Sequence, residues 1–176
     1  MKVRVEKLIA RLFLILLCQA GIVNGYCGEK LMLLEFGLDD DTLLPHVEDE
    51  KRRVASLAPF VEKGLRSFGH RVVLAETSNE MRAQIANGYL INFPASAIEM
   101  AESKNCRWVA LGKLRKFSFM ESWIRLYLVD VQSGQVVGHA ESEVRGHMTD
   151  DRMTQRTAFS LAQQIDDFIL ELREKE

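Results

Sequence analysis

The chain has 176 residues, of which 47% are hydrophobic and 27% are charged, and its formal net charge is −2. This length corresponds to one domain, and the ordinary hydrophobic content argues against a largely disordered chain. Three cysteines are too few for a small scaffold that depends on many disulfides.

The first 25 residues have the pattern of a secretory signal peptide. Basic residues precede an apolar run over residues 12–18, and small or branched residues follow up to Gly25. We expect cleavage before Tyr26, with cleavage after Ala20 as the alternative. The apolar run is shorter than the roughly 20 residues that a membrane span needs, so a retained anchor is the less favoured interpretation. The sequence therefore predicts a single α/β domain over residues 26–176, located in the periplasm or secreted.

Removal of this leader changes the charge and the cysteine count. Residues 1–25 hold four basic residues and one acidic residue, so the rest of the chain has 19 basic and 24 acidic residues. An acidic domain without a basic patch argues against binding to nucleic acid or to anionic lipid. Cys27 and Cys106 remain. In an oxidising compartment they either form one disulfide or stay as two thiols.

The first half of the mature chain is typical of a strand–helix–strand unit. The apolar run over residues 30–38 predicts a buried strand, and residues 70–75 predict a second one. Between them, residues 48–68 predict an amphipathic helix that kinks or restarts at Pro59. The three carboxylates at residues 39–41 suggest a cation site. Because no calcium-loop spacing follows, a solvated acidic loop is the favoured interpretation.

Two short helices are expected next. Thr77 and Glu80 have capping-box spacing at the start of the first, and Pro94 starts the second. Three antiparallel strands are then predicted over residues 107–117, 123–131 and 136–145. Gly134 should supply a positive φ in the turn between the last two. A long amphipathic helix from residue 150 or 151 closes the chain.

This order of elements predicts a two-layer α/β sandwich. In it, a mixed sheet of about five strands carries helices mainly on one face. Residues 34–40, 112–118, 124–134 and 144–150 resemble a family of secreted bacterial proteins known only as a domain of unknown function. The matching patterns are a strand ending in Phe-x-Leu-x-Asp, a Gly-x-x-x-Lys-x-Ser strand and an Arg-Gly closing turn. The wider architecture is similar to the amino-terminal domain of TolB and to CsgG- and LpoB-type periplasmic domains. That resemblance implies a binding or assembly module rather than an enzyme.

Polar and aromatic side chains alternate along two of the predicted strands and should therefore share one face of the sheet. They are Trp123, Arg125, Tyr127, His139, Glu141 and Arg145. Because Trp, Tyr and Arg are enriched at protein interfaces, we interpret this face as a candidate binding surface. A second hypothesis places a small polar pocket where the loop at residues 39–41 meets residues 145–147.

An enzymatic alternative rests on His139, Glu141 and Glu143, which could bind a divalent metal in a small secreted hydrolase. The solvent face of a sheet is the more ordinary interpretation, because no second cluster completes four ligands. Cys106 beside Arg107 could be a reactive thiol, although a buried or disulfide-bonded cysteine is favoured there. Because the sequence lacks a phosphate loop and known hydrolase motifs, it predicts no cofactor, no metal and no catalytic residues. The favoured function is a non-enzymatic binding or assembly module of an envelope system, with an envelope protein or a small ligand as partner.

Overall fold

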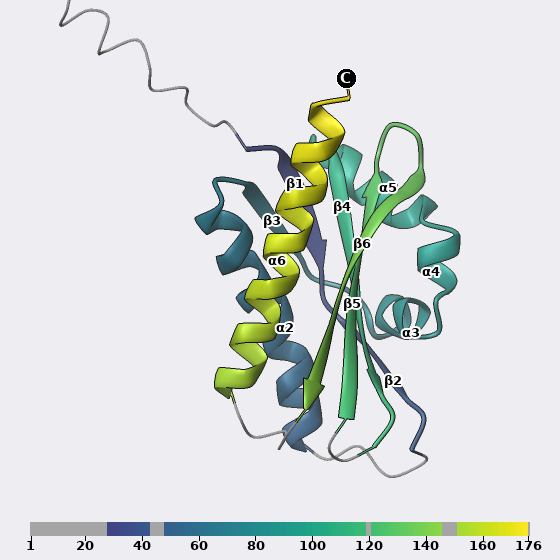
Figure 1. Cartoon of the computed structure of the whole chain (residues 1–176). Helices are drawn as coiled ribbons and strands as arrows, with labels where there is room; N and C mark the ends of the chain where they lie inside the picture. The colour runs from purple at the N-terminus through teal and green to yellow at the C-terminus, as the bar shows by residue number, and fades with distance from the viewer. Residues whose placement is uncertain (1–27, 43–47, 119–120, 146–150, 176) are drawn as a thin grey trace, which may run out of the picture.

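The structure is a computed structural model that describes residues 28–42, 48–118, 121–145 and 151–175. The expected signal peptide and Cys27 lie outside these ranges. The strands are β1 (Lys30–Leu34), β2 (Gly37–Asp40), β3 (Arg71–Ala75), β4 (Trp108–Lys116), β5 (Glu121–Asp130) and β6 (Gln135–Arg145). The helices are α2 (Glu48–Ser67), α3 (Asn79–Ala86), α4 (Tyr89–Asn92), α5 (Ala95–Ser103) and α6 (Asp151–Arg173) (Figure 1). None of these helices is both long enough and apolar enough to span a membrane.

In the described ranges, the strands form one mixed sheet with the order β3-β1-β4-β5-β6, and β2 pairs with β4 beyond the end of β1. β1 is parallel to β3 and β4, whereas β4, β5 and β6 form an antiparallel meander. Parallel neighbours need long crossovers, which α2 and the short helices supply. The turn between β5 and β6 holds Gly134 at a φ of +71°. The predicted α/β class, its mixed sheet and this turn are therefore confirmed.

Helices cover the two faces of the sheet unequally. The long helices α2 and α6, of 20 and 23 residues, pack together on one face and bury the larger core (Figure 1). The short helices α3, α4 and α5 pack on the other face, and the sequence did not predict α4. Of the fully buried residues in this second core, β5 contributes only Val129 and β6 contributes none of those described. The short helices therefore stop near β4 and leave the adjoining surface of β5 and β6 uncovered.

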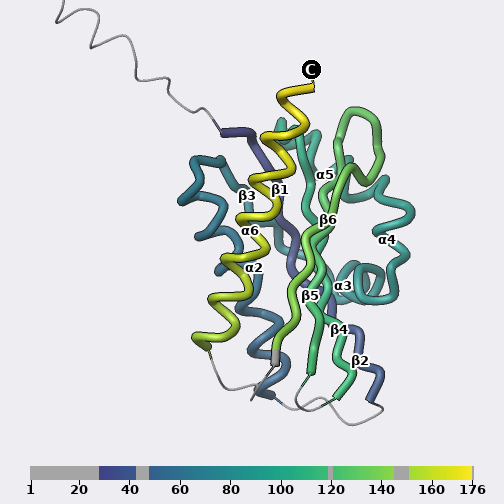
Figure 2. The backbone as a smooth tube through the Cα atoms, viewed as in Figure 1, coloured from purple at the N-terminus to yellow at the C-terminus, as the bar shows by residue number. Residues whose placement is uncertain are grey.

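The two ends of the sheet carry different elements. β1 begins and α6 ends at the same end of the molecule, which also holds the β5–β6 turn (Figure 2). β2 ends at the opposite end, where β4, α2 and α6 also have a terminus (Figure 2). Residues far apart in the sequence, such as Asp40 and Lys116, thus meet at this second end.

The single strand predicted over residues 30–38 is split into β1 and β2. Leu33 lies opposite Ala110 and Gly37 opposite Lys113, so this strand holds one residue more than β4 over the same stretch. One extra residue on one strand is the mark of a β-bulge, which bends a strand and redirects a side chain. Here the redirected side chain is that of Glu35, which reaches the start of α3.

Two helix details also differ from the prediction. α2 runs through Pro59 as one helix and does not restart there. The N-cap of α3 is Ser78, whose hydroxyl accepts a hydrogen bond from the Met81 N–H at 3.1 Å. The predicted cap, Thr77, is buried and donates its hydroxyl proton to Glu35 at 2.7 Å. The Thr77 side chain therefore bonds Glu35 in a distant part of the chain and does not cap the helix, although the local pattern predicted a cap.

The outer edge of β6 is covered by a side chain of α6. The Glu141 N–H donates to Gln164 Oε1 at 3.2 Å, and Gln164 Nε2 donates to the Glu141 carbonyl at 3.2 Å. The amide thus occupies the donor and the acceptor that a further strand would use. Exposed strand edges promote association between chains, so this contact protects the edge of β6 at Glu141.

Replacement of Gln164 by Met should remove both hydrogen bonds while keeping the length of the side chain. We expect a loss of about 1–2 kcal/mol in the free energy of unfolding, measured by urea denaturation. Sedimentation velocity should also show more self-association than in the wild type. Gln163→Met, at an exposed position of the same helix, is the matched control and should change neither property. Equal stability and equal self-association of the two variants would show that Gln164 does not protect the edge of β6.

Candidate functional site

The candidate binding face lies on β5 and β6, on the side away from α2 and α6. Arg125 lies opposite Glu141, and Tyr127 lies opposite His139. Trp123 precedes them by one period of the strand and shares their face. These five side chains thus fall on one face, as the alternation predicted. The sixth predicted residue, Arg145, is the last residue of β6 and lies opposite Glu121. The loop that follows it, including His147, is outside the described residues.

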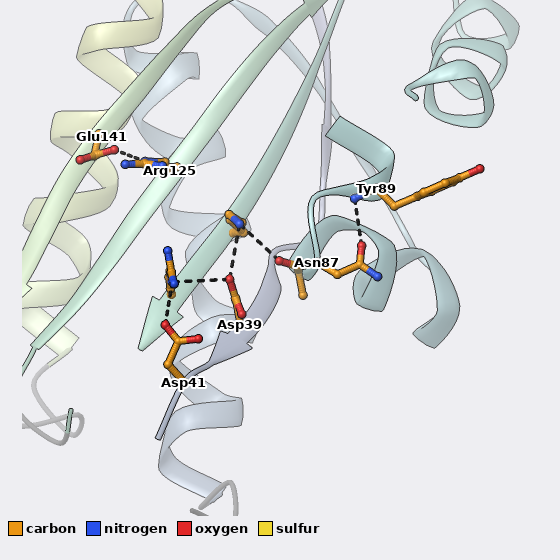
Figure 3. Close-up of polar contacts among 9 residues, drawn as sticks. Asp39, Asp41, Asn87, Tyr89, Arg125 and Glu141 are labelled. Atoms are coloured by element: carbon orange, nitrogen blue, oxygen red, sulfur yellow. Dashed lines mark hydrogen bonds and ion pairs between the residues drawn. The ribbon is translucent and has the colours of Figure 1, made fainter. Parts of the chain in front are cut away.

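Cross-strand contacts order the middle of this face. Arg125 Nε donates a hydrogen bond to the Glu141 carboxylate (Figure 3), and this bond raises the pKa of Arg125 above its ordinary value. The rings of Tyr127 and His139 have centroids 5.9 Å apart. Such cross-strand pairs stabilise a sheet by roughly 0.2–1 kcal/mol each. The face therefore presents its side chains in a fixed arrangement.

β4 adds two cations to the face that the sequence analysis did not assign to it. Lys113 Nζ lies 3.4 Å from the Asp39 carboxylate, and Arg115 Nε lies 2.8 Å from that of Asp41 (Figure 3). The signal was present, since Lys113 and Arg115 alternate along a predicted strand as the other members do. The pairing also corrects the prediction of a solvated acidic loop, because Asp39 and Asp40 belong to β2.

Lys113 also marks the border between this face and the short helices. Its Nζ lies within hydrogen-bonding distance, 3.4 Å, of the Ala86 carbonyl at the end of α3. The adjoining Asn87 side chain accepts a hydrogen bond from the Tyr89 N–H at 2.9 Å (Figure 3). The face is therefore bounded by α3 and α4 on one side.

A hollow of about 160 Å³ opens on this face. Its lining consists of Lys113, Arg115, Phe117, Trp123, Arg125 and Glu141. The Phe117 ring is 44% exposed, and the Arg115 guanidinium lies 4.9 Å from its centroid. Pockets for drug-sized ligands usually measure about 300–1,000 Å³. The smaller hollow is suited to one inserted side chain of a partner.

The residues of the metal-binding alternative have other contacts. Glu141 is engaged by Arg125, and the His139 ring packs against Tyr127. Within the described ranges, no three His, Cys, Asp or Glu side chains are placed to hold a metal ion. His139, Glu141 and Glu143 therefore lie on one face of the sheet, but they do not surround one metal position.

A second ionic cluster is buried at the end of the sheet where β2 and β4 end, beneath α2. Lys116 Nζ contacts the Glu50 carboxylate and lies 3.5 Å from Asp40 Oδ2. These three side chains are at most 5% exposed. Nearby, Arg53 Nε donates to the Thr154 hydroxyl at 3.1 Å. The cavity beside the cluster is only about 10 Å³. The cluster is therefore part of the packed interior. The polar pocket expected between residues 39–41 and 145–147 stays a prediction, because residues 146 and 147 lie outside the described residues.

A third polar group surrounds Glu35 at the β-bulge. Its carboxylate accepts hydrogen bonds from the Thr77 hydroxyl at 2.7 Å and the Thr77 N–H at 3.2 Å, and Arg82 pairs with it. Partial burial raises the pKa of Glu35, but the hydrogen bonds from Thr77 and Arg82 together outweigh burial and lower it below its ordinary value. The charged form of Glu35 is therefore favoured in the folded chain.

This lowered pKa predicts how stability depends on pH. A carboxylate with a lowered folded pKa stabilises the fold above its unfolded pKa, about 4.3 for Glu, and this contribution is lost as the pH falls through the folded value. Glu35→Gln should thus be less stable than the wild type at pH 7, and the difference should shrink below about pH 4. Urea midpoints across this range measure it. Glu99→Gln, at an exposed position of α5, should differ little from the wild type at every pH. If the loss of stability in Glu35→Gln were the same at every pH, the stability would not depend on the charge of Glu35.

Cys106 lies two residues before the start of β4 and is buried. Burial raises the pKa of its thiol, although the charge of Lys30 opposes this. A raised pKa lowers the fraction of nucleophilic thiolate, which argues against the reactive thiol considered from the sequence. The Cys27–Cys106 disulfide stays a prediction, because Cys27 lies outside the described residues.

Comparison with known proteins supports the fold. The profile of the family DUF3280, "Protein of unknown function (DUF2380)", matches residues 29–165. No curated protein matches the chain. The chain is similar in structure to the hypothetical protein CT253 from Chlamydia trachomatis, with 12% identity, a TM-score of 0.52, and coverage of 81% of this chain and 99% of that chain.

Two further solved structures are similar at lower TM-scores. PelC from Paraburkholderia phytofirmans, solved as a dodecamer, has 20% identity and a TM-score of 0.49 over 78% of this chain and 84% of that chain. The LpoB C-terminal domain from Escherichia coli has 14% identity and a TM-score of 0.45 over 68% and 84%. The resemblance to a family of unknown function, read from the sequence, is confirmed.

Proposed function

Because the chain belongs to DUF3280, a family of proteins of unknown function, we propose a function from its own residues. The protein is a non-enzymatic binding module of the bacterial envelope, and a partner protein docks on the uncovered face of β4, β5 and β6. Location in the periplasm or outside the cell rests on the signal-peptide pattern of residues 1–25. The docking surface rests on the composition of the face.

One observation carries the proposal: the hollow between β4 and β5 is bordered by Trp123, Phe117 and Arg125. Trp and Arg dominate the binding energy of many interfaces, especially where they border a pocket that a partner side chain fills. The cross-strand partners of this face hold these groups in place, which lowers the conformational entropy lost on binding. The pairing of Glu141 with Arg125 favours this binding function over the hydrolase alternative, in which Glu141 would bind a metal.

Site-specific crosslinking in cells tests the proposal. A photo-crosslinking amino acid at position 123 should capture one defined protein. The same amino acid at position 159, where Phe159 is exposed on α6, should not capture it. With that protein purified, Trp123→Ala should weaken binding by at least about tenfold, as for a central interface residue.

Leu74→Ala, at an exposed position of β3, is the control and should bind like the wild type. Capture from position 159 but not from position 123, or equal affinity of Trp123→Ala and the wild type, would exclude the sheet face as the docking surface.

A further inference from the structure

The outer edge of β2 has no strand beside it in the described part of the chain. β3 pairs with β1 only and ends at Ala75, opposite Leu34. β2 pairs with β4 on its inner side. Because β2 continues beyond the end of β3, it is the edge of the sheet over these four residues.

The hydrogen-bond pattern determines which backbone groups of β2 face outward. In a parallel pair, alternate residues direct their N–H and C=O toward the partner strand. The Asp41 N–H donates to the Lys116 carbonyl at 3.0 Å. The backbone N–H and C=O groups of Asp39 and Gly37, two and four residues earlier, therefore also point toward β4. Leu38 lies between them, and its N–H and C=O are therefore directed to the outer edge.

This edge lies in a cleft of about 480 Å³ between α2 and α3. Val54 and Ala55 of α2 form one wall, Ala83 and Ala86 of α3 form the other, and Leu38 lines the cleft between them. The long side chains of the two walls, Lys51 and Arg82, pair with Glu48 and Glu35. The volume is within the range of binding sites for ligands of several residues or one small molecule.

On each of the other two outer edges, a side chain bonds the backbone at one position. Gln164 bonds the Glu141 N–H and C=O on β6, and Arg66 Nη2 donates to the Val72 carbonyl on β3 at 2.7 Å. Within the described ranges, no side chain bonds the Leu38 backbone in this way. Proteins usually block strand edges that are not used. Among the described residues, the edge of β2 has no such side-chain bond at Leu38.

We propose that the outer edge of β2 binds an extended peptide segment of a partner protein, which adds to the sheet as a strand. The Leu38 N–H and C=O would pair with the peptide backbone, and an apolar side chain of the peptide would enter the space between Ala55 and Ala83. The cleft lining carries two cations, Lys51 and Arg82, and one carboxylate, Glu35. Arg82 pairs with Glu35, whereas Lys51 forms only an exposed pair with Glu48. Exposed pairs contribute little, so Lys51 can instead bind an acidic residue of the peptide. The proposal does not depend on the face of β5 and β6.

A phage-displayed library of random heptapeptides, selected on the full chain, tests the proposal. Enriched peptides should combine alternating apolar residues with an acidic one. A synthetic peptide of the enriched sequence should slow hydrogen exchange of the Leu38 amide by at least about tenfold, since it would become hydrogen-bonded.

Ala55→Tyr and Ala83→Tyr should fill the cleft and weaken this peptide by at least about tenfold. Both positions are exposed, so the urea midpoint should stay unchanged and report intact folding. Ala95→Tyr, at an exposed alanine of α5, and Trp123→Ala should both bind the peptide normally.

A library without binders, or peptides that bind Ala83→Tyr as tightly as the wild type, would overturn the proposal. A dimer in sedimentation that Ala83→Tyr dissolves would also overturn it, because the occupant would then be a second copy of this chain. Failure of these tests leaves the crosslinking result at position 123 unaffected, so the two surfaces are judged separately.

Discussion

Lys116→Met is expected to destabilise the protein by about 3–5 kcal/mol, because it removes a buried positive charge that contacts the buried Glu50 carboxylate. Lys116 is 1% exposed and contacts Glu50, while Asp40 Oδ2 lies 3.5 Å from its ammonium. Buried charges are retained only where opposite charges and hydrogen bonds offset their lost hydration. The urea midpoint and the slope of the transition measure the loss.

Two further variants show whether the effect comes from burial. Lys51→Met removes an exposed ion pair with Glu48, and such pairs contribute only about 0–1 kcal/mol. The double variant Lys116→Met/Glu50→Gln removes one buried charge of each sign and should recover part of the loss. A loss for Lys116→Met as small as that for Lys51→Met would show that the cluster is hydrated in solution.

Gly112→Ala should cost about 3 kcal/mol through overpacking of the core. A Cβ on Gly112 would lie 2.2 Å from Cε1 of Phe36, whose side chain is 1% exposed and enclosed by the core. Protein interiors are packed as densely as organic crystals, so the ring has little room to move away. Thermal unfolding and urea denaturation should both show the loss.

The cause can be confirmed by giving the new methyl group space. Phe36→Leu should destabilise the wild type but cost less in the Gly112→Ala background, because the two substitutions share one contact. Gly138→Ala is a matched control on β6, where a Cβ would lie 3.2 Å from the partly buried Phe168. It should change stability by less than about 1 kcal/mol. Independent effects of Gly112→Ala and Phe36→Leu would rule out the proposed clash.

The sequence alone predicted the sheet meander well, for a physical reason. β4, β5 and β6 are long, alternate regularly and are joined by short connections, so local pattern and tertiary pairing agree. The same alternation placed Trp123, Arg125 and Tyr127 on one face. Lys113 and Arg115 follow the same rule on β4 and could have been assigned with them.

Other features depend on contacts between distant segments, which a local pattern does not encode. Lys116 ends a strand and pairs with a carboxylate 66 residues earlier in the chain, so its burial has no local signal. Thr77 fits the capping pattern, yet Glu35 engages it from 42 residues away. α4 has four residues, which is too short for a helical period to be recognised.

The extra residue at Glu35 reverses which residues of the strand point into the core. Before it, the odd residues Leu31 and Leu33 point into the larger core; after it, the even residues Phe36 and Leu38 do so. This change of parity is what sends Asp40 inward to Lys116 and Asp39 outward to Lys113. Deletion of one residue here would therefore turn the Asp40 side chain toward the surface and the Asp39 side chain toward the interior. The bulge therefore determines which carboxylate of β2 pairs with a buried lysine and which pairs with a lysine of the binding face.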